Sequence, residues 1–297
     1  MKYSMTKLKK DSGQIALNLV FIVIALCYIL PLVLLVSVSF EGDPSQTFHL
    51  IPQKFSLEAY KAVFQNGERI VKAYGVTIFT SVVGTLISLF LSSTLAYSLT
   101  KRDFKLRNIF TFLLMFTTLF GGGLVPQYVV YSKFLHLNDT IWIYILPWAV
   151  NGWNVIVIRT NMQAIPNELI ESAKLDGAGE WRTFFQIVLP LSTPILGTIG
   201  FLGFIGSWND WYIASIYIRD LDLMNLQALL QSILKNIDEL KRMFLEGEAG
   251  SEALKALEKL ESIRFAMAIV AAGPALVIFP FFQRFFSRGM TVGSVKG

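Results

Sequence analysis

The longest apolar run in the chain extends from Ile15 to Phe40 and contains no charged residue. A helix of this length is long enough to cross the roughly 30 Å of hydrocarbon in a bilayer. A signal peptide has a shorter apolar core that ends at a small-residue cleavage site. We therefore predict a retained membrane-spanning helix. It is preceded by a basic segment that contains Lys2, Lys7, Lys9 and Lys10.

Five further apolar runs predict a polytopic membrane protein. They lie at about residues 74–99, 109–131, 141–159, 189–218 and 264–286. Only 16% of the residues are charged, against about 25% in an ordinary soluble domain. The sequence thus predicts an all-α fold with six transmembrane helices, in which residues 1–14 form a terminal segment and residues 15–297 form the membrane domain. No room is left for a soluble enzyme domain.

The distribution of basic residues predicts the orientation. If the N-terminus is cytoplasmic, segments 1–14, 100–108, 159–188 and 284–297 lie inside, with fourteen Lys/Arg against six Asp/Glu. The remaining connections hold twelve Lys/Arg against fourteen Asp/Glu. Positive residues favour the cytoplasmic side, so both termini and the connection between the fourth and fifth spans are predicted to be cytoplasmic. Basic residues beside apolar spans act as orientation signals, so the net charge of +5 does not indicate nucleic-acid binding.

The connection between the fourth and fifth spans does not resemble a solvated linker. Pro166 suits the first position of a helix, and Glu168 follows where the helix dipole favours a negative group. Gly177 and Gly179 can end such a helix and turn the chain. A second helix is expected from about Glu180. A short helix held crosswise in this way is suited to docking into a groove on a partner protein.

The same connection resembles the EAA loop of ABC-importer permeases. The matching residues are Glu171-Ser172-Ala173, Asp176-Gly177-Ala178 and Ile187-Val188-Leu189-Pro190, and the family form differs only in having alanine where Ser172 stands. The resemblance implies the type I ABC importer permease fold, with a cytoplasmic coupling helix at about residues 167–179. The residues it assigns to contact with an ATPase are Glu168, Glu171, Ser172, Ala173, Asp176, Gly177 and Ala178.

A polar cluster lies inside the fifth predicted span, where a carboxylate is costly and normally faces a cavity or a partner. Aromatic rings beside an amide and a carboxylate suit sugar recognition. The alternative is that the cluster lies at the outer interface, where Trp and Tyr act as anchors. The candidate substrate-pathway residues are Trp208, Asn209, Asp210, Trp211 and Tyr212, with a weaker set in the fourth span, Asn151, Trp153 and Asn154.

Two other segments carry predictions. The outer connection at residues 219–263 shows helical periodicity at residues 226–244 and 252–263, interrupted by glycines, and predicts a helical hairpin. A glycine triplet, Gly121 to Gly123, predicts either a break in the third span or a close helix crossing.

The C-terminal segment resembles the ending of maltose-type carbohydrate permeases, where the tail reaches into the ATPase dimer. By that resemblance Ser294, Val295, Lys296 and Gly297 are candidate ATPase contacts. The whole pattern is similar to the carbohydrate-uptake branch of type I ABC importers, close to polysaccharide permeases. The similarity implies a bacterial cytoplasmic-membrane permease that imports an oligosaccharide by alternating access. The implied partners are a second permease in a heterodimer, two copies of an ATPase that use ATP and Mg²⁺, and an extracytoplasmic solute-binding protein.

No sequence feature indicates catalysis or a metal site in the chain itself. It has no Gly-Lys-Ser/Thr phosphate loop, one cysteine and two histidines, so no cofactor is expected. Two alternatives remain open: an ion-coupled secondary transporter with Asp210 as the carrier residue, and a membrane scaffold subunit without transport. The first leaves the helix–turn of the cytoplasmic connection unexplained.

Overall fold

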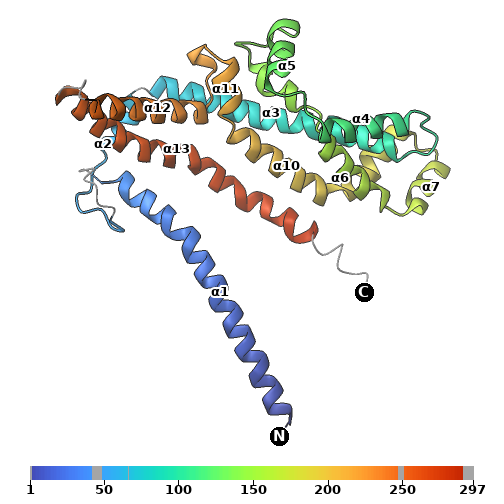
Figure 1. The fold of residues 1–297 in the computed structure, drawn as a ribbon. Helices are drawn as coiled ribbons and strands as arrows, with labels where there is room; N and C mark the ends of the chain where they lie inside the picture. Colours follow the sequence, from blue (N-terminus) through green and yellow to red (C-terminus); the bar gives the residue numbers. More distant parts are fainter. Residues whose placement is uncertain (1, 42–48, 66, 247–250, 290–297) are drawn as a thin grey trace. The chain divides into compact units, whose positions relative to one another are not determined.

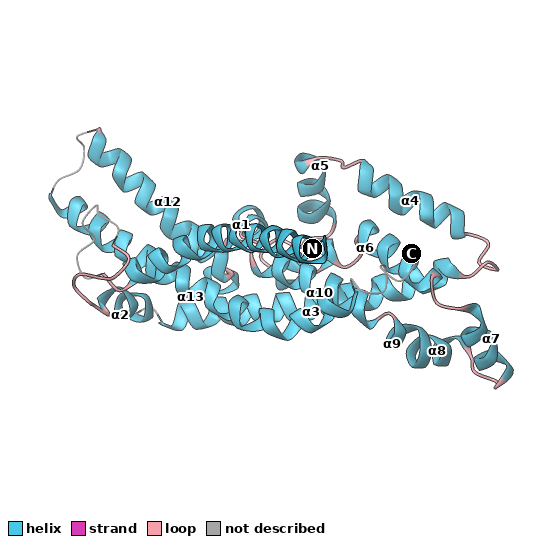
Figure 2. Cartoon of the chain, turned by 90° about the horizontal axis from the view of Figure 1, so that it is seen from below, coloured by secondary structure: helices cyan, strands magenta, loops and turns pink. Residues whose placement is uncertain are grey.

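The computed structural model describes residues 2–41, 49–65, 67–246 and 251–289. In these residues the chain is helical, without a strand, and Glu41 and Phe55 form an isolated β-bridge (Figures 1 and 2). The α-helices, in chain order, are α1 (Lys2–Ser39), α2 (Glu58–Gln65), α3 (Gly67–Thr100), α4 (Arg107–Leu119), α5 (Leu124–Val129), α6 (Gly152–Gln163), α7 (Asn167–Leu175), α8 (Glu180–Thr183), α9 (Leu189–Leu191), α10 (Thr193–Trp208), α11 (Tyr212–Tyr217), α12 (Leu226–Leu245) and α13 (Ser251–Gly289). Short π or 3₁₀ turns are η1 (Val130–Phe134), η2 (Ile141–Tyr144), η3 (Leu146–Trp148), η4 (Phe184–Val188) and η5 (Leu221–Leu223).

The described helices supply six potential membrane crossings, three of them continuous and three bent. The continuous ones are 13–39 in α1, all of α3, and 263–280 in α13. The bent pairs are α4 with α5–η1, η2–η3 with α6, and α8–α9 with α10, at angles of 115°, 47° and 77°. The third, fourth and fifth predicted spans thus each consist of two helical pieces that meet at a bend. Apolar composition predicts which segments can lie in the lipid, whereas glycine and proline determine where a helix bends.

The third span breaks at its glycines, as one of the two predicted alternatives required. Gly123 has a φ of +84°, which an L side chain rarely adopts, and α5 begins directly after it. The predicted fifth span, residues 189–218, ends as a helix at Trp208; α11 follows after a three-residue break. The predicted outer hairpin also differs: its second arm is continuous with the last span, as α13.

The chain divides into two compact parts. In the first, residues 1–67 and 232–271, the segment after α1 folds back on the end of that helix. Glu41 accepts hydrogen bonds from the backbone N–H groups of Gln53 and Lys54 at 2.8 and 2.9 Å. The ring of Phe40 stacks on Phe55, with centroids 5.3 Å apart. These contacts fix the entry to α2.

In the second part, residues 68–231 and 272–297, α3 carries two buried apolar clusters at different levels along its length. Val76 belongs to one cluster, with residues of η2 and α11. Ala96, Tyr97 and Leu99 belong to the other, with residues of α6, η4 and α10. The stretch of α3 between these two clusters lines the cavity described below, so burial at both ends holds the wall of that cavity in place.

Helices α4 and α6 pack closely at Gly152. A Cβ atom built there would lie 2.6 Å from both the carbonyl oxygen of Leu114 and the hydroxyl of Thr118, so alanine must push the two helices apart. We expect Gly152→Ala to destabilise the protein by about 1–3 kcal/mol, measured as a lower thermal unfolding midpoint. The matched control is Gly75→Ala in α3, where no atom lies within 4 Å; equal midpoints for the two variants would contradict the close packing.

Candidate functional site

The first candidate site is the helix α7 and the turn after it. The helix spans Asn167–Leu175, with Glu168 in its first turn and Lys174 in its last, as the dipole favours. Pro166 was predicted at the first helical position, but it has φ −55° and ψ 129° and stands at the N-cap, one position before the first helical residue, Asn167. The predicted helix and its end are otherwise confirmed.

The turn after α7 is a Schellman motif. Ala178 N–H donates to the carbonyl of Ala173 at 2.9 Å, and Gly177 N–H donates to that of Lys174 at 3.0 Å. Gly177 holds a φ of +80°, the left-handed conformation that such a motif requires. Ala173 and Ala178 are both half-buried, in line with the contact that accompanies the motif. The small residues of this loop are therefore explained by the turn: Gly177 takes the left-handed conformation, and Ala173 and Ala178 form its closing hydrogen bond.

Most of α7 faces outward. Among the residues assigned to ATPase contact, Glu168, Glu171, Ser172, Asp176 and Gly177 are exposed. Leu175 is 89% exposed and Leu169 is 46% exposed. The helix is attached on its inner side by Ile170, which packs on the cluster around Phe184. Figure 2 shows α7 beside α8 at the edge of the second part of the chain.

A polar cluster secures the base of this loop; we call its members Tyr97, Lys101, Lys174 and Glu180 the Glu180 cluster. Glu180 Oε2 lies 2.6 Å from Lys101 Nζ and accepts the Tyr97 hydroxyl at 2.6 Å. Its Oε1 lies 3.1 Å from Lys174 Nζ. Lys101 Nζ also lies 4.2 Å from the ring centroid of Tyr97. One carboxylate therefore joins the ends of α3 and α7 to the start of α8.

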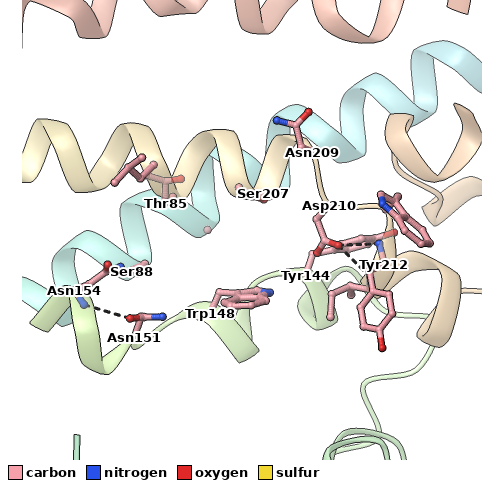
Figure 3. Close-up of a pocket in the computed structure, with 16 residues that line it drawn as sticks. Thr85, Ser88, Tyr144, Trp148, Asn151, Asn154, Ser207, Asn209, Asp210 and Tyr212 are labelled. Carbon is pink, nitrogen blue, oxygen red and sulfur yellow. Dashed lines mark hydrogen bonds between the residues drawn. The ribbon is translucent and has the colours of Figure 1, made fainter. Parts of the chain in front are cut away.

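The second candidate site is a cavity of about 530 Å³ (Figure 3), within the range usual for small-molecule sites. Its lining comes from α3, η2, η3, the start of α6, α10 and the segment after α10. The lining residues are Gly84, Thr85, Ser88, Tyr144, Trp148, Asn151, Asn154, Leu202, Gly203, Gly206, Ser207, Asn209, Asp210, Trp211, Tyr212 and Ile213. Residues that are far apart in the sequence thus form one wall.

The break between α10 and α11 is held by hydrogen bonds. Asp210 Oδ1 accepts the backbone N–H groups of Tyr212 and Ile213 at 2.9 and 3.1 Å. Asn225, which is buried, donates its side-chain amide to the carbonyl of Asp210 and accepts Ala228 N–H at 2.9 Å. The carboxylate therefore has a structural task as well as a place in the cavity wall.

The structure brings together most of the substrate-pathway residues that the sequence singled out. Asn209, Asp210, Trp211 and Tyr212 line the cavity, and so do Asn151 and Asn154 from the fourth span. Two of the candidates lie elsewhere. Trp208 is 1% exposed and its ring stacks on Phe204 at 5.6 Å, whereas Trp153 is 51% exposed and does not line the cavity.

Sequence reasoning missed part of this site. Tyr144 and Trp148 lie in 3₁₀ turns within a run that reads as apolar, and Thr85 and Ser88 resemble the other small polar residues of a membrane helix. The predicted tail contacts, Ser294 to Gly297, lie outside the described residues. Within the described residues, no group of three or more His, Cys, Asp or Glu side chains could hold a metal ion.

Comparison with known proteins decides the family. Residues 84–292 match the family described as the binding-protein-dependent transport system inner membrane component. The chain belongs to that family. This permease is 40% identical to the protein LplC of Bacillus subtilis (strain 168) over 272 residues, which cover 91% of the chain and 90% of LplC.

Two further similarities extend over almost the whole permease. It is 39% identical to the polygalacturonan/rhamnogalacturonan transport system permease protein YtcP of the same organism, covering 92% of the chain and 94% of YtcP. The crystal structure of a bacterial ABC transporter involved in the import of the acidic polysaccharide alginate matches with a TM-score of 0.79 and 26% identity, covering 92% of this chain and 95% of that one. The predicted family and the helical permease fold are confirmed, and the protein is a transport component, not an enzyme.

Proposed function

We propose that this permease passes an oligosaccharide across the bacterial cytoplasmic membrane, with ATP and Mg²⁺ used by a separate ATPase. Relatives support the substrate class: besides YtcP, the permease is 29% identical to the arabinooligosaccharides transport system permease protein AraQ of Bacillus subtilis (strain 168). The proposed assembly contains a second, homologous permease, two copies of the ATPase and an extracytoplasmic solute-binding protein. Both termini and α7 face the cytoplasm, where ATP is present.

The observation that carries this proposal is the exposed helix α7. An isolated nine-residue helix is not stable in water by itself, yet α7 is stopped by a Schellman turn and attached through Ile170 and the Glu180 cluster. Its outward face leaves Leu175 uncovered. Such a face suits insertion into a groove of the ATPase. The tail residues Ser294, Val295, Lys296 and Gly297 are proposed as a second contact with the same partner.

The proposed mechanism is alternating access. ATP closes the ATPase dimer and moves α7, and the movement passes through the Glu180 cluster into α3. The middle of α3 lines the cavity through Gly84, Thr85 and Ser88, so that displacement of this one helix changes the wall that faces the substrate. Coupling of this kind requires α7 to make different contacts in the two states.

The direct test is transport by the complete importer in proteoliposomes. We expect ATP hydrolysis to rise when binding protein and saccharide are added together, and labelled saccharide to accumulate inside the vesicles. A non-hydrolysable ATP analogue serves as the control and should give no accumulation. Uptake driven by a proton gradient without ATP would instead support an ion-coupled carrier, and absence of both activities would support a scaffold.

A further inference from the structure

The charge of the cavity wall bears on which saccharides can enter it. Among its sixteen lining residues, Asp210 is the single acidic one, and none is Lys, Arg or His. The other polar groups are neutral amides, hydroxyls, phenols and indoles. Carboxylate ligands are ordinarily bound by Arg or Lys, because guanidinium and ammonium groups supply charge-assisted hydrogen bonds. This wall offers no such cation.

The carboxylate of Asp210 has one oxygen available to a ligand. Oδ1 accepts two backbone N–H groups, whereas Oδ2 accepts no hydrogen bond from the part of the chain that the structure describes. Figure 3 shows the carboxyl group beside the rings of Tyr144 and Tyr212. An ionised carboxylate is an acceptor only, so a hydroxyl group of a sugar can donate to Oδ2 but a second carboxylate cannot.

The rest of the wall suits an uncharged sugar ring. Asn151 and Asn154 lie at the other end of the cavity from Asp210. In Figure 3, Trp148 lies between these two asparagines and Asp210. Amides both donate and accept hydrogen bonds, as sugar hydroxyls do. The indole of Trp148 is 55% exposed and that of Trp211 is 40% exposed, leaving aromatic surface for the apolar face of a ring.

We propose that this permease's part of the passage accepts uncharged saccharide units and rejects a uronate carboxylate beside Asp210. The inference rests on the proposed function. Like charges placed together without a cation oppose binding strongly. YtcP is named for polygalacturonan and rhamnogalacturonan, and the solved importer for the acidic polysaccharide alginate, so a preference for uncharged units would set this permease apart from those two proteins.

The test uses one saccharide in two charge states. A galacturonate trisaccharide and its carboxyl-reduced form have the same linkages and differ only at C6. The reporter is Ser88→Cys in a Cys27→Ser background, because Ser88 lines the cavity and Cys27 is the chain's only cysteine. Labelling of this subunit by a small thiol reagent is followed in the assembled importer without binding protein, so that the selectivity of that protein does not intervene. A chelator removes divalent cations that could bridge two carboxylates.

We expect the reduced trisaccharide to protect the reporter at a concentration about tenfold lower than the acidic one. Asp210→Asn keeps the Oδ1 acceptor and removes the charge, and should lower that ratio to about threefold or less. Equal or better protection by the acidic form, an unchanged ratio in Asp210→Asn, or no protection by either form would each overturn the inference. If the importer still couples ATP hydrolysis to uptake, the proposed function survives such a result.

Discussion

Gly177→Pro is expected to reduce ATP-driven uptake by the assembled importer strongly while the permease still inserts into the membrane. Gly177 holds a φ of +80°, whereas the ring of proline fixes φ near −65°. Proline also removes the N–H that donates to the Lys174 carbonyl at 3.0 Å, and it disfavours the conformation of Asp176 before it. The turn must therefore rearrange, and α7 loses its orientation. A coupling free energy of about 1–3 kcal/mol corresponds to a 5- to 150-fold change, so uptake should fall at least about tenfold.

The matched control for this variant lies two residues away. Gly179 has a φ of −69°, which proline adopts without strain, so Gly179→Pro should transport nearly as well as the unchanged protein. Gly177→Ala is an intermediate case, because a left-handed conformation costs an L residue about 1–2 kcal/mol. Uptake, stimulated ATP hydrolysis and the amount of permease in the membrane are measured for all three. Normal coupled uptake by Gly177→Pro would contradict the proposed role of α7.

The α7 loop could be predicted from the sequence because its signals are local. A proline at the start of the helix, an acidic residue in its first turn and a glycine beyond its end act within about ten residues. The sequence also predicts that this glycine ends the helix and turns the chain. The Schellman bonds from Gly177 and Ala178 then follow from the backbone conformation.

The bent spans and the full cavity could not be predicted in the same way. Hydropathy is an average over a window, and it gives the same signal for a straight helix and for two helices that meet at 77° before Thr193. Tyr144, Trp148 and Ser88 become cavity residues only because α3, η2–η3 and α10 come together. Trp208 shows the converse: its neighbours in the sequence line the cavity, but the pitch of α10 turns its ring toward Phe204.

The Glu180 cluster could not be predicted from local sequence signals, because two predicted spans, at about residues 109–131 and 141–159, separate Lys101 from Glu180. Its ion pairs are partly exposed, with Glu180 at 54%, Lys101 at 24% and Lys174 at 49%. Pairs of this kind contribute about 0–1 kcal/mol each to stability. The cluster therefore matters more for holding α7 and α8 against α3 than for keeping the permease folded.

Charge reversal at Glu180 is the second variant with a large expected effect. Glu180→Lys places a third ammonium group beside Lys101 and Lys174, so that attraction between α8 and the end of α3 becomes repulsion. We expect the ratio of saccharide transported to ATP hydrolysed to fall about tenfold, with little change in the thermal unfolding midpoint. Glu180→Gln should be milder, about two- to fivefold, because the amide oxygen still accepts the Tyr97 hydroxyl.

A compensating substitution separates this transmission role from a general loss of structure. Adding Lys101→Glu to Glu180→Lys restores an opposite-charge pair between α3 and α8 with the polarity exchanged. If the cluster transmits the movement of α7, the double variant should recover most of the transport lost by Glu180→Lys, because the pair again joins the two helices. Recovery in the double variant requires coupling between these two positions. A double variant no better than Glu180→Lys would show that α3 and α8 do not communicate through this contact.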